Sequence, residues 1–261
     1  MSQDISNLLK EWPFQPGQIN ARLITGADGE SRVQVRLDLG IIQMHADGRP
    51  DGEQPFGYPS LLEYYEAQIE QDEDDLPGPD GKSDKLVLSP DDCRALREEA
   101  AQFYQRYLAL LVLEDYDRVV RDTTRNLRVL DLCAKHGQTE DDRTLLEQFR
   151  PYITMMRSRA LASQAMKDNE PKAAIHALDE GLEALRSYFN DSGKPQMFDS
   201  STEVELLRGM RDALVPKLPI SQKTELRQRL AKAIEQENYE LAAILRDELK
   251  QLKDTPTTQN G

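Results

Sequence analysis

The stretch RYLALLVLEDYDRVVRDTTRNLRVL, residues 106–130, decides which fold class the sequence predicts. Apolar residues recur at helical spacing on both sides of a short acidic turn at Asp115 and Tyr116. The pair Val119 and Val120 begins three residues after Tyr116, and small aliphatic side chains at this point let two antiparallel helices approach closely. The stretch therefore predicts a helical hairpin.

Two further stretches repeat this pattern in a degraded form. Residues 159–185 read RALASQAMKDNEPKAAIHALDEGLEAL and turn around Asn169, and residues 229–252 read RLAKAIEQENYELAAILRDELKQL and turn around Asn238. The paired small residues are Ala173 and Ala174 in the second copy and Ala242 and Ala243 in the third. Because the spacing between the copies is irregular, unlike a strict tetratricopeptide array, we expect a short stack of helical hairpins that resembles tetratricopeptide hairpins only weakly.

The N-terminal part of the chain predicts β-structure. Apolar and polar residues alternate over residues 19–23 and again over residues 33–39, a period of two that indicates strands with one buried face. Gly40 interrupts the second strand, and the apolar pair Ile41 and Ile42 behind it suggests a bulge or bend. The segment thus predicts a two-stranded ribbon, which needs a packing partner to be stable.

Capping signals mark where helices begin. Ser60 and Glu63 form a capping box, and Ser89 followed by Pro90 has the pattern of an N-cap with proline at the first helical position. Between these two starts, the acidic run that begins at Gln71 and the Pro and Gly residues behind it indicate a linker.

The expected fold class is α+β and mainly α, with a small N-terminal β-ribbon and a helix followed by antiparallel helical hairpins. The expected segments are an N-terminal extension (1–17), a small β-containing module (18–70), an acidic linker (71–88), a helical-hairpin domain (89–215), a terminal helical hairpin (216–254) and a disordered tail (255–261).

The charge balance excludes several classes of partner. The chain has 33 Lys and Arg residues against 47 Asp and Glu residues, a formal net charge of −14 at pH 7. Duplex DNA and anionic membranes would repel such a chain, so we expect neither nucleic acid nor a membrane as a direct partner. The sequence has no N-terminal signal pattern and no apolar run of about 20 residues, which favours a soluble, cytoplasmic protein.

No catalytic or metal-binding pattern stands out in the sequence. Cys93 and Cys133 have no His or Cys nearby, so we expect buried free thiols rather than metal ligands. Neither a phosphate-binding G-x4-G-K-[ST] loop nor a G-x-S-x-G nucleophile elbow is present. His45 with Asp47 and Asp51 could form an acid–base or metal site, although Asp-Gly steps usually form only turns. We therefore expect no enzyme, no cofactor and no metal, with a site near these three residues as the alternative.

The third copy has the residue spacing of a coiled-coil-like hairpin. Its apolar seam positions are Leu226, Leu230 and Ala233 on the first helix and Ala242, Leu245, Leu249 and Leu252 on the second. Ile234, Leu241 and Ile244 lie off these seams. These three residues either pack on the remaining helices or are left for a partner.

The full pattern of the third copy is specific. It reads Leu226-x3-Leu230-x2-Ala233-Ile234-x2-Glu237-Asn238-Tyr239-Glu240-x-Ala242-Ala243-x-Leu245-Arg246-Asp247-x-Leu249-x2-Leu252. This pattern resembles the UVR motif, which is named for the excision-repair proteins UvrB and UvrC. The resemblance implies an antiparallel helical hairpin that binds other proteins, often another UVR hairpin. The protein-binding residues that it implies are Leu226, Leu230, Ile234, Tyr239, Leu241, Ala242, Ala243, Ile244, Leu245, Arg246, Asp247 and Leu249.

The resemblance, together with the lack of a catalytic pattern, favours a non-catalytic adaptor. Its expected partner is a protein, either another protein with a UVR motif or a second copy of this chain. The family name supports an alternative, an accessory factor in nucleotide-excision DNA repair. An enzyme with its site at residues 45–51 is the second alternative.

Overall fold

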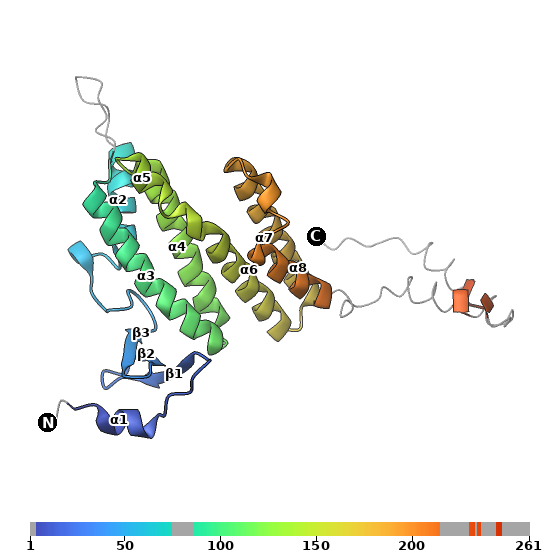
Figure 1. Cartoon of the computed structure of the whole chain (residues 1–261), viewed down its shortest axis with the longest axis horizontal. Coiled ribbons are helices and arrows are strands. Elements are labelled where there is room, and N and C mark those ends of the chain that lie inside the picture. Colours follow the sequence, from blue (N-terminus) through green and yellow to red (C-terminus); the bar gives the residue numbers. More distant parts are fainter. Residues whose placement is uncertain (1–3, 75–85, 215–229, 233, 236–243, 247–261) are drawn as a thin grey trace, which may run out of the picture. The chain divides into compact units, whose positions relative to one another are not determined.

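The computed structural model describes residues 4–74, 86–214, 230–232, 234–235 and 244–246. Its contacts group the chain into two compact units, residues 1–214 and 215–261. The first unit contains a small N-terminal antiparallel sheet followed by helices (Figure 1), which confirms the predicted α+β, mainly α fold class. The predicted tail at 255–261 and most of the predicted terminal hairpin at 216–254 lie outside the described residues.

The elements of the first unit begin with helix α1 (Ser6–Glu11), strands β1 (Asn20–Thr25), β2 (Ser31–Arg36) and β3 (Ile41–His45), the 3-10 turn η1 (Pro55–Gly57) and helix α2 (Leu61–Asp74). They continue with helices α3 (Pro90–Val112), α4 (Tyr116–His136) and α5 (Glu140–Thr144), the turn η2 (Glu147–Phe149), helices α6 (Arg150–Lys167) and α7 (Pro171–Asp191), the turn η3 (Pro195–Met197) and helix α8 (Thr202–Leu214). Among the described helices, none is long and apolar enough to cross a lipid bilayer.

The sheet has three antiparallel strands in the order β1-β2-β3, so the predicted two-stranded ribbon with a bulge at Gly40 is wrong. The backbone N–H of Leu37 donates to the carbonyl of Gly40 at 2.9 Å, which closes a tight turn. The chain therefore reverses at Gly40, and Ile41 and Ile42 start a third strand that pairs with β2. The β-branched residues fit a pleated strand better than a bend.

Both faces of the sheet are covered, which differs from the predicted single buried face. On one face, Val33 and Met44 are buried in the core of the first unit. On the other face, Arg36 donates from Nε to the carbonyl of Trp12 at 2.9 Å. The guanidinium of Arg22 lies 4.1 Å from the centre of the Trp12 ring, a cation–π contact. The segment around Trp12 thus covers the polar face, where Arg36 is buried and Arg22 is half-buried.

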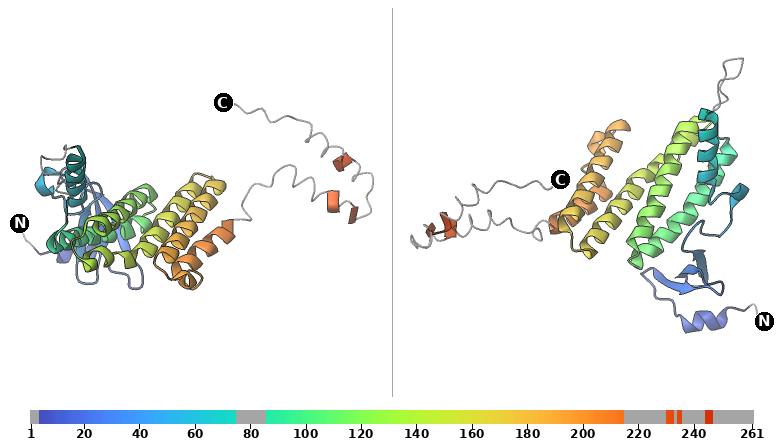
Figure 2. Two further views of the ribbon diagram at one scale, coloured as in Figure 1. Left: turned by 90° about the horizontal axis from the view of Figure 1, so that it is seen from above. Right: turned by 180° about the vertical axis from the view of Figure 1, so that it is seen from behind.

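Packed helices form the body of the first unit. α3 packs on α4, α4 on α6 and α6 on α7, while α8 packs on both α7 and α6. Figures 1 and 2 show these helices side by side in chain order, with the partners in each hairpin antiparallel. Gly181 on α7 permits the close approach, because a Cβ atom there would collide with the side chain of Ser158 on α6. This is the expected stack of helical hairpins, while its likeness to tetratricopeptide repeats stays a prediction.

The first two copies of the sequence repeat end their first helices in the same way. Glu114 has φ 56° and Asn169 has φ 62°, both in the left-handed region. The next N–H groups, of Asp115 and Glu170, donate back to the carbonyls of Leu110 and Ala165 at 3.0 and 2.7 Å. Both turns are therefore Schellman motifs, which stop one helix and position the next.

The paired small residues are offset by one position between these two hairpins. Val119 lies four residues after Asp115, and Ala174 lies four residues after Glu170; both side chains are fully buried. Ala173 is exposed. Of the predicted pair, only Ala174 lies at the contact between α6 and α7, and the predicted role of Ala173 is wrong because its side chain is exposed.

The predicted acidic linker at 71–88 is shorter than expected at both ends. Helix α2 continues to Asp74, since the first helix breaker behind Gln71 is Pro77. Leu88 is fully buried, and its N–H donates to the carbonyl of His136 at 2.8 Å. Leu88 is thus part of the core of the first unit, held by its buried side chain and by a backbone hydrogen bond, and does not belong to the linker. The residues in between, 75–85, lie outside the described part of the chain.

A buried ion pair ties the sheet to the helices. Arg106 on α3 and Asp122 on α4 are both fully buried, and two parallel hydrogen bonds of 2.7 and 2.8 Å join them. The remaining donor of Arg106, Nη1, reaches the carbonyls of His45 at 2.9 Å and Gly48 at 2.7 Å. One guanidinium thus connects two helices with the loop that follows β3.

A second buried pair lies two turns away along α3 and one turn away along α4. Glu99 on α3 forms an ion pair with Arg125 on α4 and accepts a 3.0 Å hydrogen bond from the N–H of Leu61, at the start of α2. Burial lowers the pKa of Arg125 to about 9, so its guanidinium stays charged at neutral pH. The ring of Phe103 lies between the two arginines, 4.7 Å from Arg106 and 4.1 Å from Arg125. These contacts fix α2 and the β3 loop on α3 and α4.

Replacing Arg106 with Met should destabilise the first unit strongly. The change removes both hydrogen bonds from Arg106 and leaves the buried Asp122 carboxylate with the 3.0 Å contact from Nε of Arg121. Breaking a buried ion pair in this way typically costs about 3–5 kcal/mol in the free energy of unfolding. Urea denaturation followed by circular dichroism measures the loss. The matched control is Arg208→Met, which removes an exposed ion pair with Asp199 and should cost less than about 1 kcal/mol. Equal, small losses in both variants would contradict a structural role for the buried pair.

Candidate functional site

The end of β3 and the loop after it contain the three residues that the sequence offered as an alternative catalytic site, His45, Asp47 and Asp51. Asp47 accepts hydrogen bonds from Arg118 at 2.8 and 2.9 Å and from Arg121 at 2.6 Å. The guanidinium groups, of Arg118 above all, hold the pKa of Asp47 well below its usual range. A carboxylate held in this way is a poor proton acceptor, so Asp47 is suited to holding the loop on α4.

The other two residues of this loop also have structural contacts. Asp51 accepts a hydrogen bond from Gln102 at 3.0 Å and pairs with Arg49 at 3.1 Å. Gly52 lies against the imidazole of His45 with φ 79°, and a Cβ atom at Gly52 would collide with that ring. The structure therefore places the three side chains close together in sequence and space, but both carboxylates already have partners. Asp47 is bound by arginines of α4, and Asp51 is bound by Gln102 of α3 and by Arg49 of the loop.

The two cysteines were predicted to be buried free thiols, and this is confirmed. Cys93 on α3 and Cys133 on α4 are both fully buried and unpaired by a disulfide. Burial raises the pKa of Cys133 to about 12, which keeps the thiol protonated. Over the residues that the structure describes, no cluster of three or more His, Cys, Asp or Glu side chains is placed to hold a metal ion.

Replacing Asp47 with Asn should change the stability of the fold in a pH-dependent way. Because the pKa of Asp47 is lower in the folded state, its ion pairs stabilise the fold above the unfolded pKa of about 4 and lose this effect as the pH falls below it. Since Asp47 is exposed, the difference in unfolding free energy at pH 7 should be at most about 1 kcal/mol. Urea denaturation between neutral and acidic pH measures it. A difference that stays constant over this range would contradict a role for the carboxylate charge.

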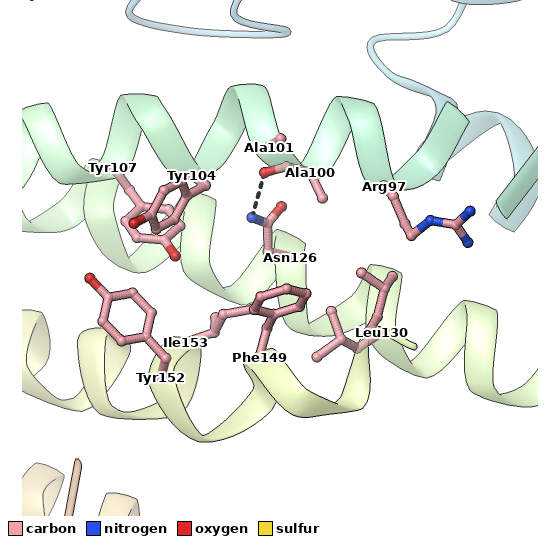
Figure 3. A pocket seen from close by; sticks show the side chains of 11 residues that line it. Arg97, Ala100, Ala101, Tyr104, Tyr107, Asn126, Leu130, Phe149, Tyr152 and Ile153 are labelled. Carbon is pink, nitrogen blue, oxygen red and sulfur yellow. Dashed lines mark hydrogen bonds between the residues drawn. The ribbon is translucent and has the colours of Figure 1, made fainter. Parts of the chain in front are cut away.

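A groove of about 420 Å³ lies across α3, α4 and the start of α6 (Figure 3). Its lining is mostly apolar, and aromatic rings form much of one side. The lining residues are Arg97, Ala100, Ala101, Tyr104, Tyr107, Asn126, Leu130, Leu146, Phe149, Tyr152 and Ile153. Tyr104 is 41% exposed and Phe149 is 50% exposed, so large aromatic surfaces face open space here.

The sequence did not indicate this groove. Its residues come from several helices that are far apart in the chain, and no local motif joins them. The weak signal that could have been used is Tyr104 with Tyr107, two aromatic residues three positions apart on a helix that also buries Phe103 and Leu110. Aromatic residues at that spacing are typical of a core, and only the arrangement of α3, α4 and α6 in the structure shows that Tyr104 is 41% exposed.

The described residues of the third sequence copy are helical and differ in their exposure. Leu245 is 1% exposed, whereas Ile234 and Ile244 are each 53% exposed. Leu230 is half-buried and Arg246 is exposed. The other predicted protein-binding residues, which lie outside the described part of the chain, are Leu226, Tyr239, Leu241, Ala242, Ala243, Asp247 and Leu249.

Comparison with known protein families identifies a motif near the end of the sequence. Residues 221–255 match the family model of the UvrB/uvrC motif, UVR. This range includes every predicted protein-binding residue, from Leu226 to Leu249, so the resemblance seen in the sequence is confirmed. No curated protein and no solved structure matches the chain. The chain therefore contains a UVR motif at its C-terminal end, following a first unit of helical hairpins.

Proposed function

We propose that this protein is a non-catalytic adaptor whose UVR motif, residues 221–255, binds a partner protein. The observation that carries the proposal is the motif match together with the exposure of Ile234 and Ile244 inside it. Apolar side chains that face solvent on a helical segment are typical of a protein-binding surface. Leu245, by contrast, is buried, which supports a role in stabilising the motif rather than in binding a partner.

The charge of the motif supports a helical partner of the same kind. Residues 221–255 contain equal numbers of basic and acidic residues, although the chain as a whole has a net charge of −14. A neutral surface with exposed isoleucines does not repel a second UVR motif, and it is suited to apolar contacts between helices. The partner is therefore another protein with a UVR motif, or a second copy of this chain.

The loop at residues 45–51 supports a non-catalytic role for the first unit. Asp47 is engaged by two arginines and Asp51 by Gln102 and Arg49, which favours a structural reading over an acid–base reading. The alternative of an enzyme with its site in this loop has less support. The first unit then acts as a scaffold that accompanies the motif.

Replacing Ile234 and Ile244 together with Asp should remove the partner without unfolding the protein. Both side chains are half exposed, so the charges stay in water in the free chain but would be buried in a complex. The recovery of partner proteins with the tagged full-length chain should fall by about tenfold or more, as measured by quantitative mass spectrometry. Sedimentation velocity of the purified chain reports loss of self-association if the partner is a second copy.

The matched control for this experiment is Leu206→Asp, which changes a side chain on α8 that is 37% exposed. It should leave the partner list unchanged. Identical partner lists and identical sedimentation for all three proteins would contradict the adaptor proposal. If the recovered partner is a subunit of excision repair, the family name of the motif also identifies the process, and a deletion strain should then be sensitive to ultraviolet light.

A further inference from the structure

The groove between α3, α4 and α6 has an apolar wall that no part of the first unit fills. Leu130 and Ile153 line it, and Ala101 on α3 leaves room because its side chain is small. Tyr104 and Phe149 each leave about half of their surface in solvent. A volume of about 420 Å³ lies within the usual range of small-molecule sites, about 300–1,000 Å³. An apolar ligand would therefore gain by covering these rings.

One end of the groove carries a cation that is only loosely paired. The Nη1 atom of Arg97 is buried and has no hydrogen-bond partner, and it lies 3.6 Å from the nearest oxygen of Asp142. That separation is too long for a hydrogen bond. Arg97 lines the groove and its side chain is 24% exposed, so the accessible part of the guanidinium can donate to an oxygen atom of a ligand. A carboxylate is the group that fits a guanidinium best.

The other end of the groove carries phenol groups. Figure 3 shows Tyr104, Tyr107 and Tyr152 gathered there, away from Arg97. Tyr107 is 1% exposed, and within the described residues its hydroxyl makes no hydrogen bond, while its ring is in edge contact with Tyr104. A buried hydroxyl without a partner costs free energy, so an oxygen atom of a ligand at this end would be favourable.

The remaining polar group of the lining is already satisfied. Asn126 donates from Nδ2 to the carbonyl of Ala100 at 3.0 Å, and its Oδ1 accepts from Arg125 at 3.2 Å. The lining contains no Asp or Glu. The groups available to a ligand are therefore the guanidinium of Arg97 and the hydroxyl of Tyr107. In a chain with a net charge of −14, this is a local site for an acid.

We propose that this groove binds an elongated apolar carboxylic acid, with its carboxylate on Arg97 and an oxygen atom at its far end on the hydroxyl of Tyr107. The positions of Arg97 and Tyr107 on α3 are ten residues apart, a rise of about 15 Å along the helix. The ligand therefore has an apolar body of roughly this length. This site lies in the first unit and is a function in addition to partner binding by the UVR motif.

The test uses the full-length chain and four probes of one chain length in isothermal titration calorimetry: ω-hydroxydecanoate, decanoate, decanediol and decylamine. ω-Hydroxydecanoate should bind most tightly and decylamine most weakly, since the amine places a cation beside Arg97. Arg97→Met should weaken both acids by about tenfold or more and leave decanediol unchanged. Tyr107→Phe should weaken ω-hydroxydecanoate by about fivefold and leave decanoate unchanged.

Two tryptophan variants locate the binding. Ala101→Trp fills the groove from an exposed position of α3 and should abolish binding of both acids. Gln105→Trp is the matched control, because Gln105 is exposed on the same helix and does not line the groove. Thermal unfolding of each variant by circular dichroism shows that it is folded. Absence of acid binding to the unchanged chain, or binding that Ala101→Trp leaves intact, would overturn the proposal. An Ala101→Trp variant that loses a partner protein while the unchanged chain binds none of the acids would also overturn it.

Discussion

The buried ion pair between Arg106 and Asp122 is the constraint on which the rest of the first unit depends. Two charges taken out of water are costly unless every donor and acceptor around them is satisfied. Arg106 meets this condition only because the β3 loop brings the carbonyls of His45 and Gly48 to its free donor. The loop must therefore sit at the crossing of α3 and α4. Its conformation is a consequence of that requirement, and this accounts for the several turn-forming glycines and aspartates between β3 and α2.

The same buried network explains why the groove is bordered by hydrogen-bond donors and contains no carboxylate. Glu99 and Asp122, acidic residues on the α3–α4 interface, are both bound to arginines inside the helix stack. Arg125 also donates a hydrogen bond to the amide oxygen of Asn126, its neighbour on α4. The carboxylates are thus used in the interior, while Arg97 and the tyrosines border the open side. A chain with a large excess of acidic residues can in this way present a surface of hydrogen-bond donors.

The sequence was sufficient for the parts of the fold that rest on local chemistry. The hairpins α3–α4 and α6–α7 follow from helical periodicity and from turns whose left-handed residues, Glu114 and Asn169, stand at equivalent places. The third β-strand was missed because its turn lacks the Asn-Gly or Asp-Gly pair that marks tight hairpins, so Gly40 read as a bulge.

Tertiary packing decides what the sequence could not show. Arg106 and Glu99 are charged residues in helical stretches, and nothing in their local sequence distinguishes them from solvated side chains. The groove likewise exists only because η2 and α6 place Phe149 and Tyr152 opposite Tyr104. The UVR motif was the exception among functional features, since its evidence is a long residue pattern in one continuous segment that does not depend on distant contacts.

The distribution of charge separates the two ways in which the UVR motif can be used. The motif is neutral, so the net charge of −14 belongs to the remainder of the chain. A complex of two identical chains contains two such acidic remainders. Their electrostatic repulsion opposes the apolar contacts between the two motifs. Screening by salt reduces that repulsion, because exposed charges interact weakly beyond about 8–10 Å at physiological ionic strength. A different UVR protein with a less acidic remainder meets no such opposition. Under the proposed adaptor function, the charge pattern therefore favours a heterologous partner at low ionic strength, and self-association is expected to be the weaker mode and to increase with salt.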